Sequence, residues 1–218
     1  MDQTRYERLK AYMRECVADS AHAEDHVTRV TNAAMEICRF EPGADREALL
    51  CACLLHDIGR GEQLKDPSRH HARVGAEKAR DFLVKNGWDA AFAARVADTI
   101  GAHSDARLAS ARGIEARILF DADKLDVIGA IGACRTVAYG AEAGEPIYDA
   151  SDLNGAPSPA GGSMLREMEN DYRFAVSSFM TARGRELAER KAAFSRAFMD
   201  ALREEMAWGS ALPGIETV

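Results

Sequence analysis

The sequence predicts an all-α protein, and three observations lead to this prediction. Apolar residues recur at helical spacing along most of the 218-residue chain. No stretch combines sustained apolar and polar alternation with the β-branched enrichment that is typical of strands. Residues that favour helix ends stand where the periodic segments begin and finish. We therefore expect a bundle of about seven or eight helices, with a helical pair towards the C-terminus.

Each expected helix has its own justification in the sequence. Asp45 precedes an apolar run as a capping residue should, Asn86-Gly87 closes a helical segment, and Gly101 lies near the end of another. The last two segments are amphipathic, and we expect them to pack as a hairpin. In order, the expected helices span residues 6–17, 25–39, 45–57, 71–86, 89–102, 114–136, 163–180 and 183–206.

Two stretches rich in Gly, Pro, Asp and Ser interrupt the helical pattern, residues 59–69 and 140–162. The first directly follows His56-Asp57, so it is a candidate rim or lid for a site. The second is long for a connection without structure and is expected to be an active-site loop or a partly disordered segment.

Composition and charge restrict the class of protein. Hydrophobic residues make up 47% and charged residues 29% of the chain, as in a compact globular protein, and the net charge is −7. An acidic chain does not suit a long nucleic acid, whereas a small phosphorylated substrate remains open. The N-terminus is polar, and the longest uncharged apolar run, residues 48–55, is too short to span a membrane. Five cysteines without a C-x-x-C pair indicate buried free thiols. We therefore expect a cytoplasmic protein without a membrane partner.

The histidines and aspartates carry the functional signal. All six histidines, at positions 22, 26, 56, 70, 71 and 103, lie in the first half of the chain. His56-Asp57 ends an apolar helix, and an imidazole with a carboxylate suits a divalent metal such as Mn, Fe, Co, Ni or Zn. His26 opens another helix, and Asp121 and Asp123 begin an acidic segment that leads into an apolar one. Two structural alternatives remain open from the residues alone. The histidines could be hydrogen-bonded members of the core, and the aspartates of the acidic segment could cap the N-terminus of a helix.

The order of these motifs resembles the HD-domain superfamily of metal-dependent phosphohydrolases. The segments that carry the resemblance, over about residues 20–140, are HVTRV at 26–30, LLHDIG at 54–59, HHARVGAEKA at 70–79, IGAHS at 100–104 and DADKLD at 121–126. The later helices, about residues 163–208, look like the C-terminal part of an uncharacterised bacterial and archaeal branch. The resemblance implies one HD-type helical domain over residues 1–218.

The resemblance also implies roles for particular residues. The family's metal ligands fall on His26, His56, Asp57 and Asp123, since Ala122-Asp123-Lys124 fits the family pattern better than Asp121 does. His71 and His103 match positions that bind a second metal in some relatives and substrate phosphate in others. The cofactor would be one or two divalent ions of Mn, Fe, Co, Ni, Mg or Zn. Asp57 and Lys124 would be catalytic, and Arg29 and Arg60, with Arg135 as a further candidate, would bind phosphate.

The expected function is metal-dependent hydrolysis of a nucleotide or another small phosphate ester or anhydride. Arg60 stands where deoxynucleoside monophosphatases of the superfamily have an acidic residue. The Glu-Asp pair of the ppGpp hydrolases and the Gly-Tyr-Pro signature of cyclic-di-GMP phosphodiesterases are also missing, so these three activities are disfavoured. The alternatives are an HD-type di-iron oxygenase and a non-catalytic metal-containing binding module. The C-terminal helices could form a homodimer surface or pack within the chain.

Overall fold

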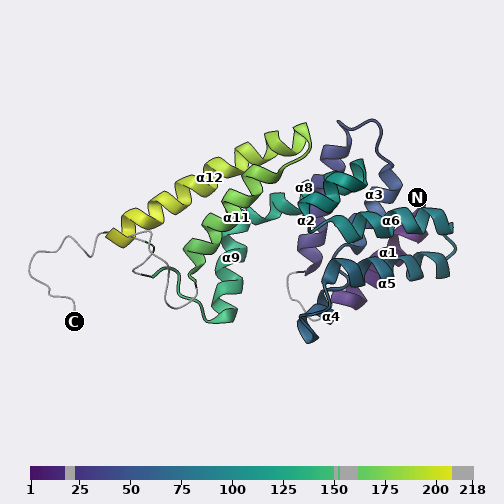
Figure 1. The fold of residues 1–218 in the computed structure, drawn as a ribbon, viewed down its shortest axis with the longest axis horizontal. Coiled ribbons are helices and arrows are strands. Elements are labelled where there is room, and N and C mark those ends of the chain that lie inside the picture. Colours follow the sequence, from purple (N-terminus) through teal and green to yellow (C-terminus); the bar gives the residue numbers. More distant parts are fainter. Residues whose placement is uncertain (18–22, 150–151, 153–161, 208–218) are drawn as a thin grey trace, which may run out of the picture. The chain divides into compact units, whose positions relative to one another are not determined.

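The computed structural model describes residues 1–17, 23–149, 152 and 162–207, and these residues form helices and short connections. The helices are α1 (Gln3–Val17), α2 (Ala23–Cys38), α3 (Arg46–Leu55), α4 (Arg60–Lys65), α5 (His71–Lys85), α6 (Ala90–Ala102), α7 (Ala106–Arg112), α8 (Ile114–Lys124), the 3-10 helix η1 (Leu125–Val127), α9 (Gly129–Ala143), α11 (Met164–Ser178) and α12 (Ala182–Ala207), as Figure 1 shows. The all-α prediction is confirmed. In the part of the chain described, no helix has the length and apolar character needed to cross a membrane.

The chain divides into two compact units. The first contains residues 1–126 and 178–185, and the second contains residues 127–177 and 186–218 as far as they are described. The expectation of a single domain over the whole chain stays a prediction.

Helix α3 lies at the centre of the first unit. It packs against α1, α2, α6 and α8, and seven of its ten residues are buried. Its N-terminus is fixed by Asp45, whose carboxylate accepts hydrogen bonds from the backbone N–H groups of Glu47 and Ala48. Since burial of apolar surface is the main favourable term in folding, this apolar helix belongs in the core. It therefore delivers His56 and Asp57, directly after its last residue, to the interior.

The expected helix over 114–136 is wrong as a single helix. Helix α8 ends at Lys124, the chain tightens into η1, and α9 begins at Gly129 with a φ of +78°. Glycine occupies this left-handed conformation without the steric penalty of other residues. A side chain at Gly132 would overlap the backbone carbonyl of Val127, so glycine is also required one turn later. The break places Asp126 in the short 3-10 turn rather than in a long helix.

Two short helices occupy stretches that the sequence pattern leaves without structure. Helix α4 lies within the expected loop 59–69, and α7 follows Asp105, which caps it through the N–H groups of Arg107 and Leu108. Helix α4 buries none of its residues, so no apolar period marks it. These helices and the break after α8 raise the number of helices above the expected seven or eight.

Asp121 anchors residues 178–185 to the first unit. Its buried carboxylate accepts hydrogen bonds from the backbone N–H groups of Met180 and Thr181 and from the Thr181 hydroxyl, at 2.6–2.9 Å. A side chain at Gly184 would overlap this carboxylate. Asp121 therefore has a structural use of its own.

In the second unit, α9, α11 and α12 pack together. Leu165 and Met168 of α11 contact Met199 of α12, with Ala133 and Tyr172 against them. This is consistent with the expected packing of the last two helices, and homodimer formation stays a prediction. Residues 150, 151 and 153–161 of the expected loop 140–162 lie outside the described residues, and α9 extends to Ala143, so it shortens that loop at its start.

Candidate metal centre

Six buried side chains of metal-binding chemistry converge at helix ends in the first unit. None of the six residues exposes more than 8% of its total surface. They are His26 in the first turn of α2, His56 and Asp57 after α3, His71 at the start of α5, His103 after α6, and Asp123 in the last turn of α8.

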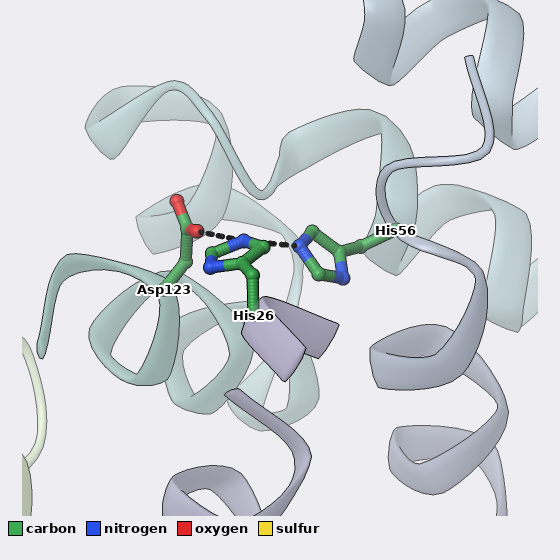
Figure 2. A group of neighbouring side chains, drawn as sticks. All are labelled: His26, His56 and Asp123. Carbon is green, nitrogen blue, oxygen red and sulfur yellow. Dashed lines mark hydrogen bonds and ion pairs between the residues drawn. The ribbon is translucent and has the colours of Figure 1, made fainter. Parts of the chain in front are cut away.

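His26 lies at the centre of one half of this cluster. Its Nε2 atom is 3.2 Å from Nε2 of His56 and 3.4 Å from Oδ1 of Asp123, and Figure 2 shows its ring between the two residues. Oδ2 of Asp57 lies 3.6 Å from both nitrogen atoms. The structure thus brings together the four residues predicted to bind metal.

The two oxygen atoms of Asp57 face different pairs of histidines. Whereas Oδ2 faces His26 and His56, Oδ1 lies 3.8 Å from Nε2 of His71 and 3.8 Å from Nε2 of His103. Both of these last Nε2 atoms are buried and have no hydrogen-bond partner among the described residues. A buried polar atom without a partner costs free energy, and this arrangement is typical of a site that receives a ligand.

Backbone carbonyl groups fix the orientation of two imidazoles. Nδ1 of His56 donates to the carbonyl oxygen of Cys53 at 2.8 Å, and Nδ1 of His103 donates to that of Ile100 at 2.6 Å. Because a carbonyl oxygen can only accept, the hydrogen of each neutral ring stays on Nδ1. The lone pair is therefore on Nε2, the atom that faces the centre.

The other two imidazoles are oriented by residues that the sequence analysis does not assign to the site. Nδ1 of His26 donates to Oδ2 of Asp126 at 2.7 Å, and Nδ1 of His71 donates to Oε1 of Gln63 at 2.7 Å. Asp126 is the last residue of the DADKLD motif, and this position is the only sequence feature that could point to a role in the site. Gln63 carries no signal, because it stands on α4, where a loop is expected.

Burial keeps three of the histidines neutral. It lowers the pKa of His56, lowers that of His71 to about 3, and lowers that of His103 to about 4. Removal from water disfavours the charged imidazolium, and neighbouring positive groups act in the same direction. At neutral pH these rings can therefore offer a lone pair to a cation.

The remaining groups of the cluster carry charge. Burial opposes ionisation of Asp57 and Asp123, but the positive charges of Arg60 beside Asp57 and of Lys124 beside Asp123 help to hold both pKa values below the usual range. Burial also opposes the charged form of His26, yet its hydrogen bonds to Asp123 and to a second carboxylate raise its pKa to about 9. The charged His26 ring thus lies between two carboxylates, with Nδ1 facing Asp126 and Nε2 facing Asp123.

The spacing and chemistry of these atoms fit a divalent cation. Ligand atoms lie about 2.0–2.2 Å from such ions, so two ligands of one ion stand roughly 3 Å apart. The 3.2 Å and 3.4 Å separations around His26 have this size. Two overlapping groups satisfy the spacing needed for metal binding, His26 with His56 and Asp123, and His56 with Asp57 and His103. Nitrogen and carboxylate ligands suit Mn, Fe, Co, Ni or Zn.

Glycine residues permit the close approach of His71 to the His-Asp pair. A side chain at Gly59 would overlap the backbone of His71 and of Gly75. Lys78 reinforces this contact, because its ammonium donates to the carbonyl oxygen of Ile58 at 2.8 Å. Helix α5 is therefore held directly against the segment that follows Asp57.

Two predicted catalytic or phosphate-binding cations flank the cluster. Nε of Arg60 donates to Oδ1 of Asp57, and Nζ of Lys124 donates to Oδ2 of Asp123, both at 3.0 Å. The side chain of Arg60 is half exposed, whereas that of Lys124 is largely buried. Asp123 therefore faces His26 with Oδ1 and Lys124 with Oδ2, whereas Oδ1 of Asp57 faces Arg60 as well as two of the histidines.

Two other predicted cations lie in different surroundings. Arg29 donates to Asp126 with two nitrogen atoms, at 2.7 and 3.0 Å. Arg135 stands on α9 in the second unit, where its guanidinium lies 5.3 Å from the centre of the Tyr139 ring. His22, the remaining histidine of the first half besides His70, lies outside the described residues.

An all-α bundle with imidazole and carboxylate ligands gathered at helix ends defines a helical protein with a candidate metal centre. Residues 24–128 match the HD domain family, a span that contains all six side chains of the cluster. This part of the chain is therefore an HD domain.

Solved structures are similar to this chain along nearly its whole length. A predicted HD superfamily hydrolase from an uncultured Thermotogales bacterium is 26% identical, with a TM-score of 0.64 over 94% of this chain and 99% of that one. An HD-superfamily hydrolase from Bacillus thuringiensis is 24% identical, with a TM-score of 0.73 over 94% and 98%. YpgQ of Bacillus subtilis, in complex with ADP, is 24% identical, with a TM-score of 0.71 over 97% and 96%. No curated protein matches the sequence.

Proposed function

We propose that this protein is a metal-dependent phosphohydrolase that acts on a nucleotide or another small phosphate ester or anhydride. The observation that carries the proposal is the convergence of buried histidine Nε2 atoms on the Asp57 carboxylate, with Arg60 and Lys124 beside it. Such a site has ligands for a cation and separate positive charges for phosphate. The HD domain at residues 24–128 supports the same reaction class.

Different residues of the chain would have different roles in this reaction. His26, His56, Asp57 and Asp123 would hold the ion, which lowers the pKa of a bound water molecule and neutralises charge on phosphoryl oxygens. Asp57 would also orient the attacking water and accept its proton. Arg60 and Lys124 would bind phosphate oxygens and stabilise the charge that develops on them, and Lys124 is the more rigidly placed of the two.

His71 and His103 would bind a second ion rather than phosphate. Their Nδ1 atoms donate to oxygen atoms, so the neutral rings offer only a lone pair at Nε2. A lone pair attracts a cation and repels a phosphate oxygen. The low pKa values of both groups keep them in this neutral form at pH 7. Since Oδ1 of Asp57 faces both rings, Asp57 would contact both ions.

The neighbouring histidines 70 and 71 provide a matched test of the second ion. His71 is buried in the cluster, whereas His70 is exposed and precedes α5. Metal analysis after loading with Mn²⁺ and removal of excess should give about one ion fewer in His71→Asn than in the wild type. His70→Asn should keep the wild-type content. Equal metal content in the two variants would show that His71 is not a ligand.

Nucleotides are the first substrates to test. YpgQ, which has this fold, is known in complex with ADP. The positive side chains at this site, Arg60 and Lys124, suit phosphate groups, and the acidic chain as a whole favours a small substrate over a long polyanion. Nucleoside mono-, di- and triphosphates and simple phosphate monoesters would separate anhydride hydrolysis from ester hydrolysis.

The decisive experiment compares the wild type with Asp57→Ala and Asp123→Ala. Metal-loaded wild type should release phosphate or pyrophosphate from at least one member of this panel, and both variants should lose bound metal and activity. Undiminished hydrolysis by both variants would rule out the proposed site. A wild type that binds metal but hydrolyses nothing, and whose variants only melt at lower temperature, would indicate a binding module.

An oxygenase is the second candidate, and the histidine-rich half of the cluster is the observation that favours it. His71 and His103 add two nitrogen ligands that a mononuclear hydrolase does not need. The two reactions differ in oxygen use. Hydrolysis should proceed at the same rate without oxygen, whereas oxygen uptake coupled to turnover of an iron-loaded protein would favour the oxygenase.

A further inference from the structure

Asp126 is a buried carboxylate that joins His26 to Arg29. Its Oδ2 atom accepts a hydrogen bond from Nδ1 of His26 at 2.7 Å. Its Oδ1 atom accepts from Nε of Arg29 at 2.7 Å, and Oδ2 also accepts from Nη2 of Arg29 at 3.0 Å. Only 3% of Asp126 is exposed. A buried charge is costly unless it is paired, and this paired contact with a guanidinium supplies the partner.

The geometry of this pair restricts the orientation of His26. A guanidinium and a carboxylate that meet through two hydrogen bonds tend to become coplanar, which fixes the carboxylate plane. Because the carboxylate can only accept, Nδ1 of His26 carries a hydrogen, and Nε2 is directed to His56 and Asp123. Asp126 also lies three residues after Asp123, so one short segment supplies a ligand and the support for another ligand.

We infer that Arg29 is a positioning residue, which acts through Asp126 to hold His26 in the orientation that binds metal. The inference rests on the proposed metal centre and differs from a phosphate-binding role for Arg29. The third contact of its guanidinium is also with a carboxylate, since Nη1 donates to Asp25 at 2.7 Å. The guanidinium of Arg29 is therefore engaged by two carboxylates of the protein itself.

The test measures Mn²⁺ affinity by calorimetry in wild type, Arg29→Met, Asp126→Asn and the double variant. Loss of an outer partner of a metal-bound histidine typically lowers metal affinity about 10–100-fold. We expect a loss of this size in each single variant and no further loss in the double variant, because both act through one hydrogen bond to His26. The matched control is Arg39→Met, which removes an exposed ion pair with Glu36 and should bind Mn²⁺ as the wild type does.

Arg29→Lys separates geometry from charge and keeps the experiment informative if Arg29→Met folds poorly. Lysine keeps the positive charge but cannot form the paired planar contact, so Mn²⁺ affinity should still fall at least severalfold. The visible spectrum of the Co²⁺-loaded protein, which reports ligand geometry, should also change in Arg29→Lys. Wild-type affinity and an unchanged spectrum in this variant would overturn the inference.

A phosphate-binding role for Arg29 would give a different pattern. In that case Arg29→Met would keep wild-type Mn²⁺ affinity, and the Mn²⁺-loaded variant would bind inorganic phosphate more weakly than the wild type. That result would overturn the inference and leave the metal centre intact. Failure of the proposed metal centre is distinguishable, because the wild type itself would then bind no Mn²⁺, and failure of the hydrolase proposal alone would leave these Mn²⁺ affinities as expected.

Discussion

The backbone of His71 lies directly against Gly59, with no space for a side chain between them. The conformation of Gly59, with φ −94° and ψ −2°, is that of the third residue of a type I turn, which most residues can adopt, so the close contact and not the backbone conformation requires glycine. The substitution Gly59→Ala would push α5 away from the segment that follows Asp57. Overpacking of this kind costs about 1–3 kcal/mol of stability and sometimes more.

Urea unfolding of Gly59→Ala should show this loss, and Mn²⁺ affinity should fall because His71 moves with α5. The control is Gly43→Ala, since no atom lies within 4 Å of a side chain built at Gly43. Its stability should stay within about 0.5 kcal/mol of the wild type. Equal stabilities of the two alanine variants would mean that the backbone contact at Gly59 is not tight.

Asp121 and Asp123 stand two residues apart and should respond differently to the same substitution. Asp121→Asn removes a charged acceptor from the N–H groups of Met180 and Thr181, which should cost about 1.5–3 kcal/mol of stability. Asp123→Asn removes a proposed ligand, so Mn²⁺ affinity should fall by more than the roughly 10–100-fold typical of outer partners.

Calorimetry and urea unfolding of the two variants would check this contrast. Asp121→Asn should bind Mn²⁺ within a few-fold of the wild type once it is folded, as far-UV circular dichroism would verify. A greater loss of Mn²⁺ affinity in Asp121→Asn than in Asp123→Asn would exchange the roles of the two carboxylates.

Local chemistry explains which parts of this structure could be predicted from the sequence. Helical period and caps such as Asp45 are local signals, so most helices and the positions of His56 and Asp57 follow from them. The break after Lys124 depends on the left-handed Gly129, a residue that an apolar helical pattern tolerates. Helix α4 has no apolar face, and its position depends on contacts with α1 and α5.

The contacts at the site that the sequence pattern does not predict are those between residues far apart in the sequence. His26 and Asp126 are 100 residues apart, so their hydrogen bond has no local signal. For the same reason the sequence suggests Arg29 as a phosphate ligand, since its pairing with Asp126 is visible only in three dimensions. Family resemblance supplied the proposed ligand set, and the structure adds the contacts that orient those ligands.

Metal binding should release protons in a pH-dependent way. The pKa of His26 is about 9 in the metal-free protein, so at pH 7 the ring carries a proton that a metal ion must displace. His56, whose pKa is lowered, is already neutral, and the carboxylates are already ionised. We expect release of about one proton for the first ion, and an apparent Mn²⁺ affinity that rises about tenfold per pH unit between pH 6 and 8.

Calorimetry in two buffers with different ionisation enthalpies would count the proton at pH 7. A count near zero would contradict the raised pKa of His26. The raised pKa of His26 also affects the metal-free protein, because the protonated ring binds its partners more strongly in the folded state and so stabilises that state. This stability is fully present below the unfolded value of 6.5 and is lost as the pH rises through about 9.

In the second unit, the Asp152 carboxylate should make stability fall in acid. It accepts hydrogen bonds from the Ser163 hydroxyl and the Asp149 N–H, both at 2.7 Å, and from Arg166 at 2.8 and 3.0 Å. Burial alone would raise its pKa, but these hydrogen bonds lower it below the ordinary value of 3.8. A depressed pKa means that the stabilisation is present above the unfolded value and is lost as the pH falls through the folded value.

The substitution Asp152→Asn should therefore destabilise the protein by about 1.5–3 kcal/mol at pH 7, because a charged acceptor is lost. The difference from the wild type should begin to shrink as the pH falls below about 4, because the carboxyl of the unfolded wild type then takes up a proton that the folded protein does not. Urea unfolding at pH 7, 5 and 3.5 would show this convergence. Glu189→Gln, on the exposed face of α12, is the control and should change stability by less than about 0.5 kcal/mol at pH 7. A difference between Asp152→Asn and the wild type that stays constant down to pH 3.5 would mean that the hydrogen bonds do not depend on the charge of Asp152.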